Sequence, residues 1–234
     1  MKYRFGKTIV IALGGSIMYP EAIDSRFLKN FRAFILKRVR PPTGGGTRFI
    51  IITGGGRTAR IYQEAAEKIA CISDEDKDWL GIHATRANAH LLRTILRDVA
   101  NPVIVDSREK MNGLRYPVTI ASGWRPGWST DYIAIAIAAH FKVKEVVVAG
   151  KPSFVYDKDH QKHANAKPLP ELLWTAYQRL IPRKWKPGLH TPVDPVAAEL
   201  ARKRKIKAVI VNGRDLENFS KLLDGKNFNG TVIS

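Results

Sequence analysis

The chain has 234 residues, of which 44% are hydrophobic, so it can bury one large core or two small lobes and is too apolar for a disordered protein. A formal net charge of +18 favours phosphorylated or polyanionic partners but specifies no fold. The single cysteine, Cys71, excludes an intramolecular disulfide and suits a reducing compartment, and we expect it to be a small buried residue on a helix.

No segment of the sequence has the features of a signal peptide or a membrane span. Residues 1–6 form a short polar segment, unlike the start of a signal peptide. The longest apolar block, 132–139, is much shorter than the roughly 20 residues that cross a bilayer. The sequence therefore predicts a cytoplasmic protein without a membrane partner.

Strand-like apolar runs alternate with longer helical stretches along the chain. In chain order, the periodicity predicts strand 8–13, helix 24–39, strand 48–53, helix 57–69, helix 76–97, strands 102–105 and 118–121, a helix from a Ser129-Thr130-Asp131 cap to about 141, strand 145–149, helix 195–203, strand 208–211, helix 215–222 and strand 231–233. The segment 150–188 has five prolines and no strong periodicity, which predicts a loop-rich stretch. This alternation is typical of an α/β fold with a mostly parallel sheet covered on both faces.

Three glycine-bearing loops follow predicted strands. They are Gly14-Gly15-Ser16, Gly54-Gly55-Gly56 and the segment 122–131. One glycine pair after a strand is usually only a turn. Because the carboxyl ends of parallel strands meet at one edge of a sheet, three such loops together predict a site that holds several phosphates.

A series of motifs runs through nearly the whole chain. The segments are ALGGSIMYP, ITGGGRTAR, DWLGIHATRANAHLL, RPGWSTD, VYDKD, VDPVAAELA and the closing NGTVI. In content and order they resemble those of archaeal-type uridylate (UMP) kinases, a branch of the amino-acid kinase superfamily. The resemblance implies a three-layer αβα sandwich, the amino-acid kinase fold, as one domain over 1–234. Residues 1–140 would then bind the acceptor and 141–234 would bind ATP.

The same resemblance implies an activity and partners. The activity is the transfer of the γ-phosphoryl group of ATP, with Mg²⁺, to UMP, a step of pyrimidine nucleotide biosynthesis. The partners are the two nucleotides and further copies of the chain, commonly in a hexamer. Nucleic acid is a conceivable partner that the resemblance does not favour.

Individual residues receive roles from the matching motifs. The resemblance assigns ATP binding to Gly14, Gly15, Ser16, Gly56, Lys151, Tyr156 and Asp159. It assigns UMP binding to Gly55, Asp78, Trp124, Arg125, Pro126, Gly127, Trp128, Ser129 and Thr130. It places Arg60, Asp131 and Asp194 near the reacting phosphates, and no residue is predicted to be a dedicated metal ligand.

The chemistry of phosphoryl transfer fits these residue types, since it needs positioning and charge neutralisation more than covalent help. Arg60 can neutralise charge on the transferring group, and Asp131 can orient a cation or hold a metal-bound water. No general base is required, because the UMP phosphate is already an anion. The carboxylates also have structural interpretations: Asp131 and Asp194 can cap the helices that follow them, and Asp78 can be an ordinary exposed side chain.

Two segments differ from the family pattern. GKPSFVY at 150–156 replaces the motif TNVDGVY, so Lys151 offers a point charge in place of hydrogen-bonding groups. In the acceptor loop, Trp124, Arg125 and Trp128 replace the Thr and His residues of THPGHTTD, and the indoles can stack on a base or narrow the site. Three functions therefore compete: a UMP kinase, a kinase of the same fold with another small acceptor, and a catalytically inactive nucleotide- or RNA-binding protein.

Overall fold

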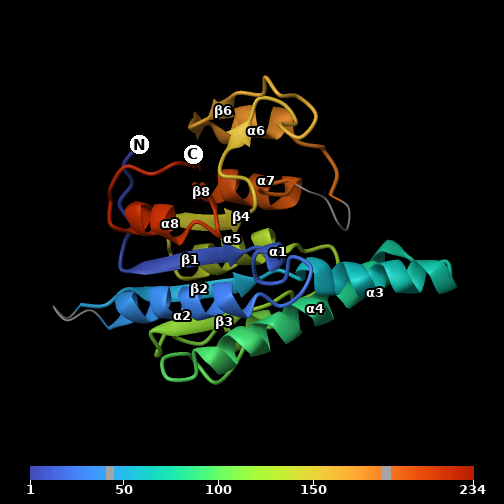
Figure 1. Cartoon of the computed structure of the whole chain (residues 1–234), viewed down its shortest axis with the longest axis horizontal. Coiled ribbons are helices and arrows are strands. Elements are labelled where there is room, and N and C mark those ends of the chain that lie inside the picture. The colour runs from blue at the N-terminus through green and yellow to red at the C-terminus, as the bar shows by residue number, and fades with distance from the viewer. Residues whose placement is uncertain (41–44, 186–190) are drawn as a thin grey trace.

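A computed structural model describes residues 1–40, 45–185 and 191–234 (Figure 1). Its centre is a seven-stranded sheet with the order β3-β2-β1-β4-β8-β9-β7. The strands are β1 (Thr8–Leu13), β2 (Arg48–Thr53), β3 (Val118–Ala121), β4 (Glu145–Gly150), β7 (Glu171–Leu172), β8 (Lys207–Asn212) and β9 (Thr231–Ile233), and β5 (Val155–Tyr156) pairs with β6 (Pro168–Leu169) outside the sheet. The five strands from β3 to β8 are parallel, whereas β9 is antiparallel to β8.

Helices cover both faces of this sheet. They are α1 (Gly15–Met18), α2 (Ser25–Val39), α3 (Gly56–Ile69), α4 (Asp74–Ile95), α5 (Thr130–His140), α6 (Trp174–Leu180), α7 (Pro195–Arg204) and α8 (Leu216–Leu223), with a short 3₁₀ turn at Arg108–Lys110. Buried side chains of α2, α4 and α8 form one core with the sheet, and those of α5, α6 and α7 form the other. The predicted three-layer α/β sandwich with a mostly parallel sheet is therefore confirmed.

Alternate residues of each central strand serve the two cores. In β1, Ile9, Ile11 and Leu13 join the core under α2, whereas Val10 and Ala12 join the core under α5. All five are at most 4% exposed. A parallel strand buried on both faces reads as a continuous apolar run, which is why this strand could be predicted from the sequence.

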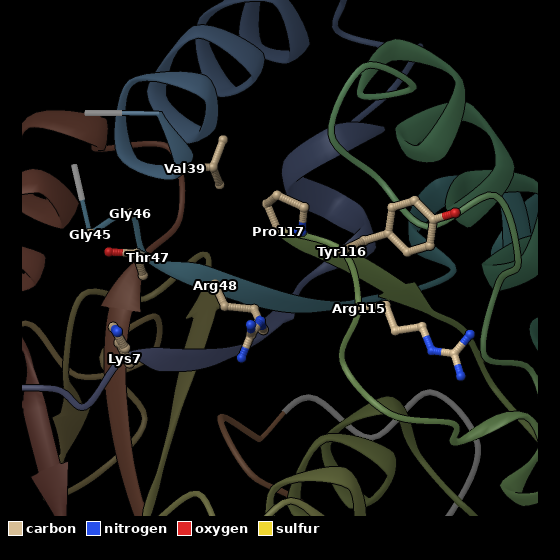
Figure 2. Close-up of a pocket in the computed structure, with 9 residues that line it drawn as sticks. All are labelled: Lys7, Val39, Gly45, Gly46, Thr47, Arg48, Arg115, Tyr116 and Pro117. Carbon is tan, nitrogen blue, oxygen red and sulfur yellow. The ribbon is translucent and has the colours of Figure 1, made fainter. Parts of the chain in front are cut away.

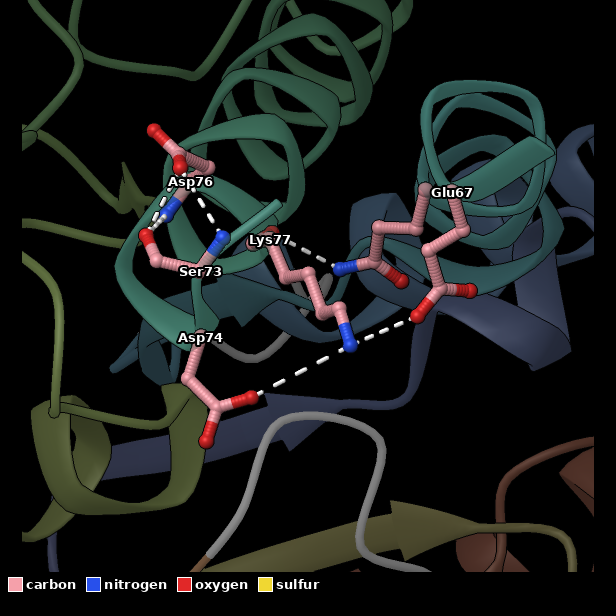
Figure 3. A network of polar contacts seen from close by, with 6 residues as sticks. Glu67, Ser73, Asp74, Asp76 and Lys77 are labelled. Atoms are coloured by element: carbon pink, nitrogen blue, oxygen red, sulfur yellow. Dashed lines mark hydrogen bonds and ion pairs between the residues drawn. The ribbon is translucent and has the colours of Figure 1, made fainter. Parts of the chain in front are cut away.

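The corner between α3 and α4 is held by polar contacts (Figure 3). Ser73 caps α4 by accepting from the Asp76 N–H at 3.1 Å, and the Asp76 carboxylate accepts from the Ser73 N–H at 3.0 Å. The Lys77 ammonium lies 2.6 Å from Glu67 near the end of α3. This reciprocal cap fixes where α4 begins and therefore the register of the residues along it.

Two expectations from the sequence are wrong, and one segment contains more regular structure than expected. Residues 102–105 form no strand. Only Ala100 and Val105 bridge to β3, at Val118 and Ala121, so the chain between these two bridges is longer than the facing part of β3 and bulges away from it. The segment predicted to be loop-rich contains the short strands β5, β6 and β7 and the helix α6, whose seven residues are too few for a clear period. Cys71 is exposed in the turn after α3 rather than buried on a helix, because α3 ends at Ile69 and Ala70 is extended.

None of the helices in the described ranges combines the length and the apolar composition needed to cross a membrane.

Candidate active site

Two of the glycine loops touch backbone to backbone. A Cβ on Gly15 would lie 2.1 Å from the Gly56 nitrogen and 2.5 Å from the Gly54 oxygen, so no side chain fits there. Gly56 also has a φ of +63°, a conformation that favours glycine. Gly54 donates its N–H to Leu13 at the end of β1, at 2.9 Å. The glycine loops at the carboxyl ends of β1 and β2 are thus joined into one surface. We call this surface, made of Gly14, Gly15 and Gly54–Gly56, the glycine floor.

Asn88 of α4 holds the second loop from below. Its side-chain amide donates to the carbonyl oxygens of Gly54 at 2.8 Å and Gly55 at 3.1 Å. Asn88 is 6% exposed, so these carbonyls have little access to water. No role for Asn88 was predicted from the sequence. An asparagine among the buried positions of α4 was the signal that could have found it.

The third loop, 122–131, is anchored at several points. The Gly123 N–H donates to Thr85 Oγ1 of α4 at 2.8 Å, and the Trp124 indole N–H donates to the Val105 carbonyl at 3.1 Å. Near the tip, the Gly127 N–H donates to Asp78 Oδ2 at 2.8 Å, and Gly127 has a φ of +82°. Asp78 therefore shapes this loop, and burial raises the pKa of Asp78 while the Gly127 N–H opposes that rise.

The two indoles of this loop have different environments. Trp124 is 7% exposed and belongs to the core between the sheet and α5. Trp128 is only partly buried, with its ring 4.8 Å from that of Tyr132 and the Arg125 guanidinium 4.7 Å from its centroid. Trp124 therefore packs in the core, whereas Trp128 and Arg125 form the outer part of the loop.

A cleft of about 1120 Å³ opens above the glycine floor. Ten of the predicted site residues line it: Gly14, Gly15, Ser16, Gly56, Arg60, Thr130, Asp131, Lys151, Tyr156 and Asp159. The lining of this cleft does not include the others, which are Gly55, Asp78, Trp124, Arg125, Pro126, Gly127, Trp128, Ser129 and Asp194. The structure thus brings the first two glycine loops, the start of α5 and the segment after β4 around one cavity.

Arg60 and Arg57 differ in their surroundings, although both lie in the first turns of α3. The Arg57 guanidinium is paired with Glu64 at 2.8 Å. Arg60 lines the cleft and has no carboxylate within 4 Å in the part of the chain that the structure describes. Its charge is therefore available to an anion in the cleft.

Two carboxylates meet where α5 and α7 begin. Asp194 is 3% exposed and caps α7, accepting from the N–H groups of Val196 at 2.8 Å and Ala197 at 3.1 Å. Its other oxygen accepts from the Ser129 hydroxyl, and Ser129 in turn caps α5. Burial, reinforced by the nearby Asp194 carboxylate, holds the pKa of Asp131 well above its ordinary value.

The segment beyond β4 forms the far wall of the cleft. The rings of Tyr156 and His160 stack with centroids 4.5 Å apart, and Asp159 accepts from the Gln161 N–H at 3.0 Å. That hydrogen bond lowers the pKa of Asp159, with Lys162 at 3.6 Å adding to the effect. A carboxylate and an aromatic pair thus line the same cleft as the glycine floor.

No group of three or more His, Cys, Asp or Glu side chains with metal-binding geometry occurs among residues 1–40, 45–185 and 191–234. A divalent cation in this cleft would need ligands from a bound phosphate as well as from Asp131.

Replacing Asn88 by alanine tests the contact below the loop. The change leaves the buried Gly54 and Gly55 carbonyls without a donor, so we expect the free energy of unfolding to fall by about 1–3 kcal/mol. Urea denaturation of Asn88→Ala measures this loss. Thr94→Ala, an exposed position on the same helix, is the control and should change little. Equal stabilities for the two variants would contradict the proposed contact.

Comparison with known proteins identifies the family of this chain. The chain matches the Amino acid kinase family over residues 7–212. It is 32% identical over 228 residues to a uridylate kinase of Thermococcus kodakarensis, covering 96% of this chain and 98% of that protein. It is also 32% identical to a uridylate kinase of Sulfolobus acidocaldarius, covering 80% and 84% of the two chains.

Solved structures agree. The uridylate kinase of Archaeoglobus fulgidus superposes with a TM-score of 0.80 and 27% identity over 100% of both chains. The UMP kinase of Bacillus anthracis, at 20% identity and a TM-score of 0.75 over 97% and 96% of the chains, shares the fold. The resemblance that the motifs predicted is confirmed, and the chain belongs to the amino acid kinase family.

Proposed function

We propose that this protein transfers the γ-phosphoryl group of ATP to UMP, giving UDP and ADP. The observation that carries the proposal is the contact of Gly15 with Gly54 and Gly56, which joins two phosphate-binding loops into one floor beside Arg60 and Asp131. Two nucleotides can then meet with their phosphates end to end. The relatives named uridylate kinases, which match nearly the whole chain, support UMP as the acceptor.

ATP would occupy the 1120 Å³ cleft. Gly14, Gly15, Ser16 and Gly56 would hold its phosphates through backbone N–H groups, to which glycine allows close approach. Lys151 would add a point charge. Tyr156 and Asp159 on the far wall would contact the adenosine end.

UMP would lie against the second and third loops. Gly55 would contact its phosphate, and Asp78 would hold the loop 124–130 in place through Gly127 while facing the ribose. Of the loop residues, Arg125 and Trp128 offer an exposed cation and a partly exposed ring, and Pro126, Gly127, Ser129 and Thr130 shape the backbone between them. Trp124 would act from the core by anchoring this loop.

Catalysis would rest on charge neutralisation. Arg60 would bind the transferring phosphoryl group, whose equatorial oxygens spread the charge in the transition state. Asp131 would orient a cationic group or metal-bound water beside it, and Asp194 would fix the start of α5 through Ser129. The UMP phosphate attacks as an anion, so no residue needs to remove a proton from it.

Mg²⁺ fits this donor set, because the ion is usually held by one or two carboxylates together with substrate phosphates. Asp131 is the carboxylate that lines the cleft. When bound, Mg²⁺ would neutralise charge on the β- and γ-phosphates.

We also propose that the protein is a homo-oligomer of six copies, the number common among the kinases that its motifs resemble. Helix α3 extends beyond the sheet (Figure 1) and leaves Ile61, Tyr62 and Ile69 exposed to 42%, 61% and 86%. Tyr62 and Ile69 are seven residues apart, which places them two turns apart on one side of the helix, with Ile61 beside Tyr62. A second copy of this chain would cover that apolar stripe.

The central test is a direct assay. Purified protein with ATP, Mg²⁺ and a panel of nucleoside monophosphates should convert UMP to UDP at a higher kcat/KM than any other acceptor, as measured by chromatography of the products. Transfer to a different acceptor alone, or to none, would refute the proposal.

Replacing Arg60 by alanine should lower kcat by about 100-fold, as the loss of one donor to developing charge typically does. Steady-state kinetics of Arg60→Ala measure the loss. Arg57→Ala is the matched control, since Arg57 lies in the same turns but is paired with Glu64, and it should keep kcat within a few-fold of the parent protein. Similar kinetics for the two variants would remove Arg60 from the reaction.

Replacing Ile69 by glutamate should reduce the oligomer to smaller species, because it places a charge within the apolar stripe. Light scattering after size-exclusion chromatography gives the mass. Ile23→Glu, at a position 55% exposed outside α3, is the control and should leave the mass unchanged. A monomeric parent protein, or an Ile69→Glu variant of unchanged mass, would disprove this interface.

A further inference from the structure

A row of cations crosses the edge of the sheet opposite the cleft. Each of the five neighbouring parallel strands begins at an exposed basic residue or within three residues after one. In the spatial order of β3, β2, β1, β4 and β8, these residues are Arg115, Arg48, Lys7, Lys144 and Lys207. They come from distant parts of the sequence, and the strand order brings them to one edge of the sheet. We call this set the basic row.

Backbone hydrogen bonds of the sheet fix the row. The Arg48 N–H donates to the Lys7 carbonyl at 2.9 Å, and the Lys207 N–H donates to the Lys144 carbonyl at 2.9 Å. The Phe49 N–H donates to the Pro117 carbonyl at 2.8 Å, which ties the segment after Arg115 to β2. Since neighbouring strands lie about 4.8 Å apart, five of them extend over roughly 20 Å.

The charge of the basic row is scarcely neutralised by the protein. None of the five side chains has a carboxylate within 4 Å in the described part of the chain, unlike Lys110, which is paired with Asp106, and Lys221, which is paired with Glu217. The nearest acidic residue along the row is Glu145, which pairs in register with Lys207 and accepts from the Gly6 N–H at 3.4 Å. One carboxylate against five cations leaves a positive strip.

One end of the row borders a small cleft (Figure 2). The cleft measures about 290 Å³, and Arg48 lies between Lys7 and Arg115 in the view of Figure 2. Tyr116, 40% exposed, is part of the same wall. The described residues that line this cleft include three cations and an aromatic ring but no acidic side chain.

We propose that the basic row binds single-stranded nucleic acid, with the phosphate backbone along the cations and a base against Tyr116. A positive groove that follows the backbone, together with an exposed aromatic ring, is the usual device for binding single strands without sequence preference. The row lies at the amino ends of the strands and the nucleotide cleft at their carboxyl ends, so both can be occupied at once. The overall charge of +18 supplies long-range attraction to such a polyanion.

The test uses the full-length protein and a fluorescein-labelled single strand of 20 nucleotides with mixed sequence, prepared as RNA and as DNA. Fluorescence anisotropy at several salt concentrations gives the affinity. Arg48→Glu with Arg115→Glu should weaken binding at least tenfold and lower the slope of log affinity against log salt by about 1.4, since each phosphate contact on a single strand contributes about 0.7. Tyr116→Ala alone should weaken binding about fivefold or more.

The matched control is Arg26→Glu with Lys29→Glu. It changes the net charge by the same amount at two exposed positions on α2, away from the row. We expect it to keep most of the affinity. Arg48→Gln with Arg115→Gln serves if the double glutamate variant loses its circular dichroism spectrum, and it should weaken binding in the same direction.

Several results would overturn the proposal. Equal losses in the row and control variants would indicate attraction by net charge alone. Competition by saturating ATP and UMP would place the strand in the nucleotide cleft. Tighter binding of the corresponding duplex, or no binding of either single strand at 0.15 M salt, would also refute it. RNA and DNA bound alike would identify the phosphate backbone as the ligand, and a strong preference for RNA would identify the 2′-hydroxyl as a further contact.

Discussion

The architecture of the cleft depends on one steric constraint, the contact between the backbones of Gly15 and Gly54–Gly56. A Cβ at Gly15 would meet the Gly56 nitrogen at 2.1 Å, and a Cβ at Gly54 would meet the Gly15 nitrogen at 2.5 Å. Any other residue would therefore push the ends of β1 and β2 apart. Because both strands are parallel and adjacent, this single contact joins two loops into the glycine floor, on which the proposed function places two phosphorylated ligands.

Helix α4 supports that floor and the third loop together. Thr85 and Asn88 lie three residues apart, so both point from one face of the helix. Thr85 accepts from Gly123 and Asn88 donates to Gly54 and Gly55. The capping box at Ser73 fixes the start of α4, which sets the position of both side chains. A shift of α4 would consequently move the second and third loops as a unit.

The sequence predicts the central strands and the glycine loops because their signals are local. A strand buried on both faces, such as β1, is continuously apolar, and a glycine loop can be read directly from the sequence. The clamp by Asn88 and the packing of Trp124 were not predicted, since each depends on a partner far away in the chain: Gly54 for Asn88 and Val105 for Trp124. Helix α6 was missed because its two buried aromatics, Trp174 and Tyr177, are too few to set a period.

The charged side chains at the carboxyl ends of the strands differ from those at the amino ends, and each set matches the anion proposed to bind there. At the carboxyl edge the cleft is lined by the cations Arg60, Lys151, Lys158 and Lys162 and by Asp131, which lies near the buried Asp194. Burial and the neighbouring Asp194 carboxylate raise the pKa of Asp131. At the amino edge the five cations of the basic row are exposed and have one carboxylate, Glu145, among them, so the ligand proposed there is a flexible polyanion rather than an aligned nucleotide.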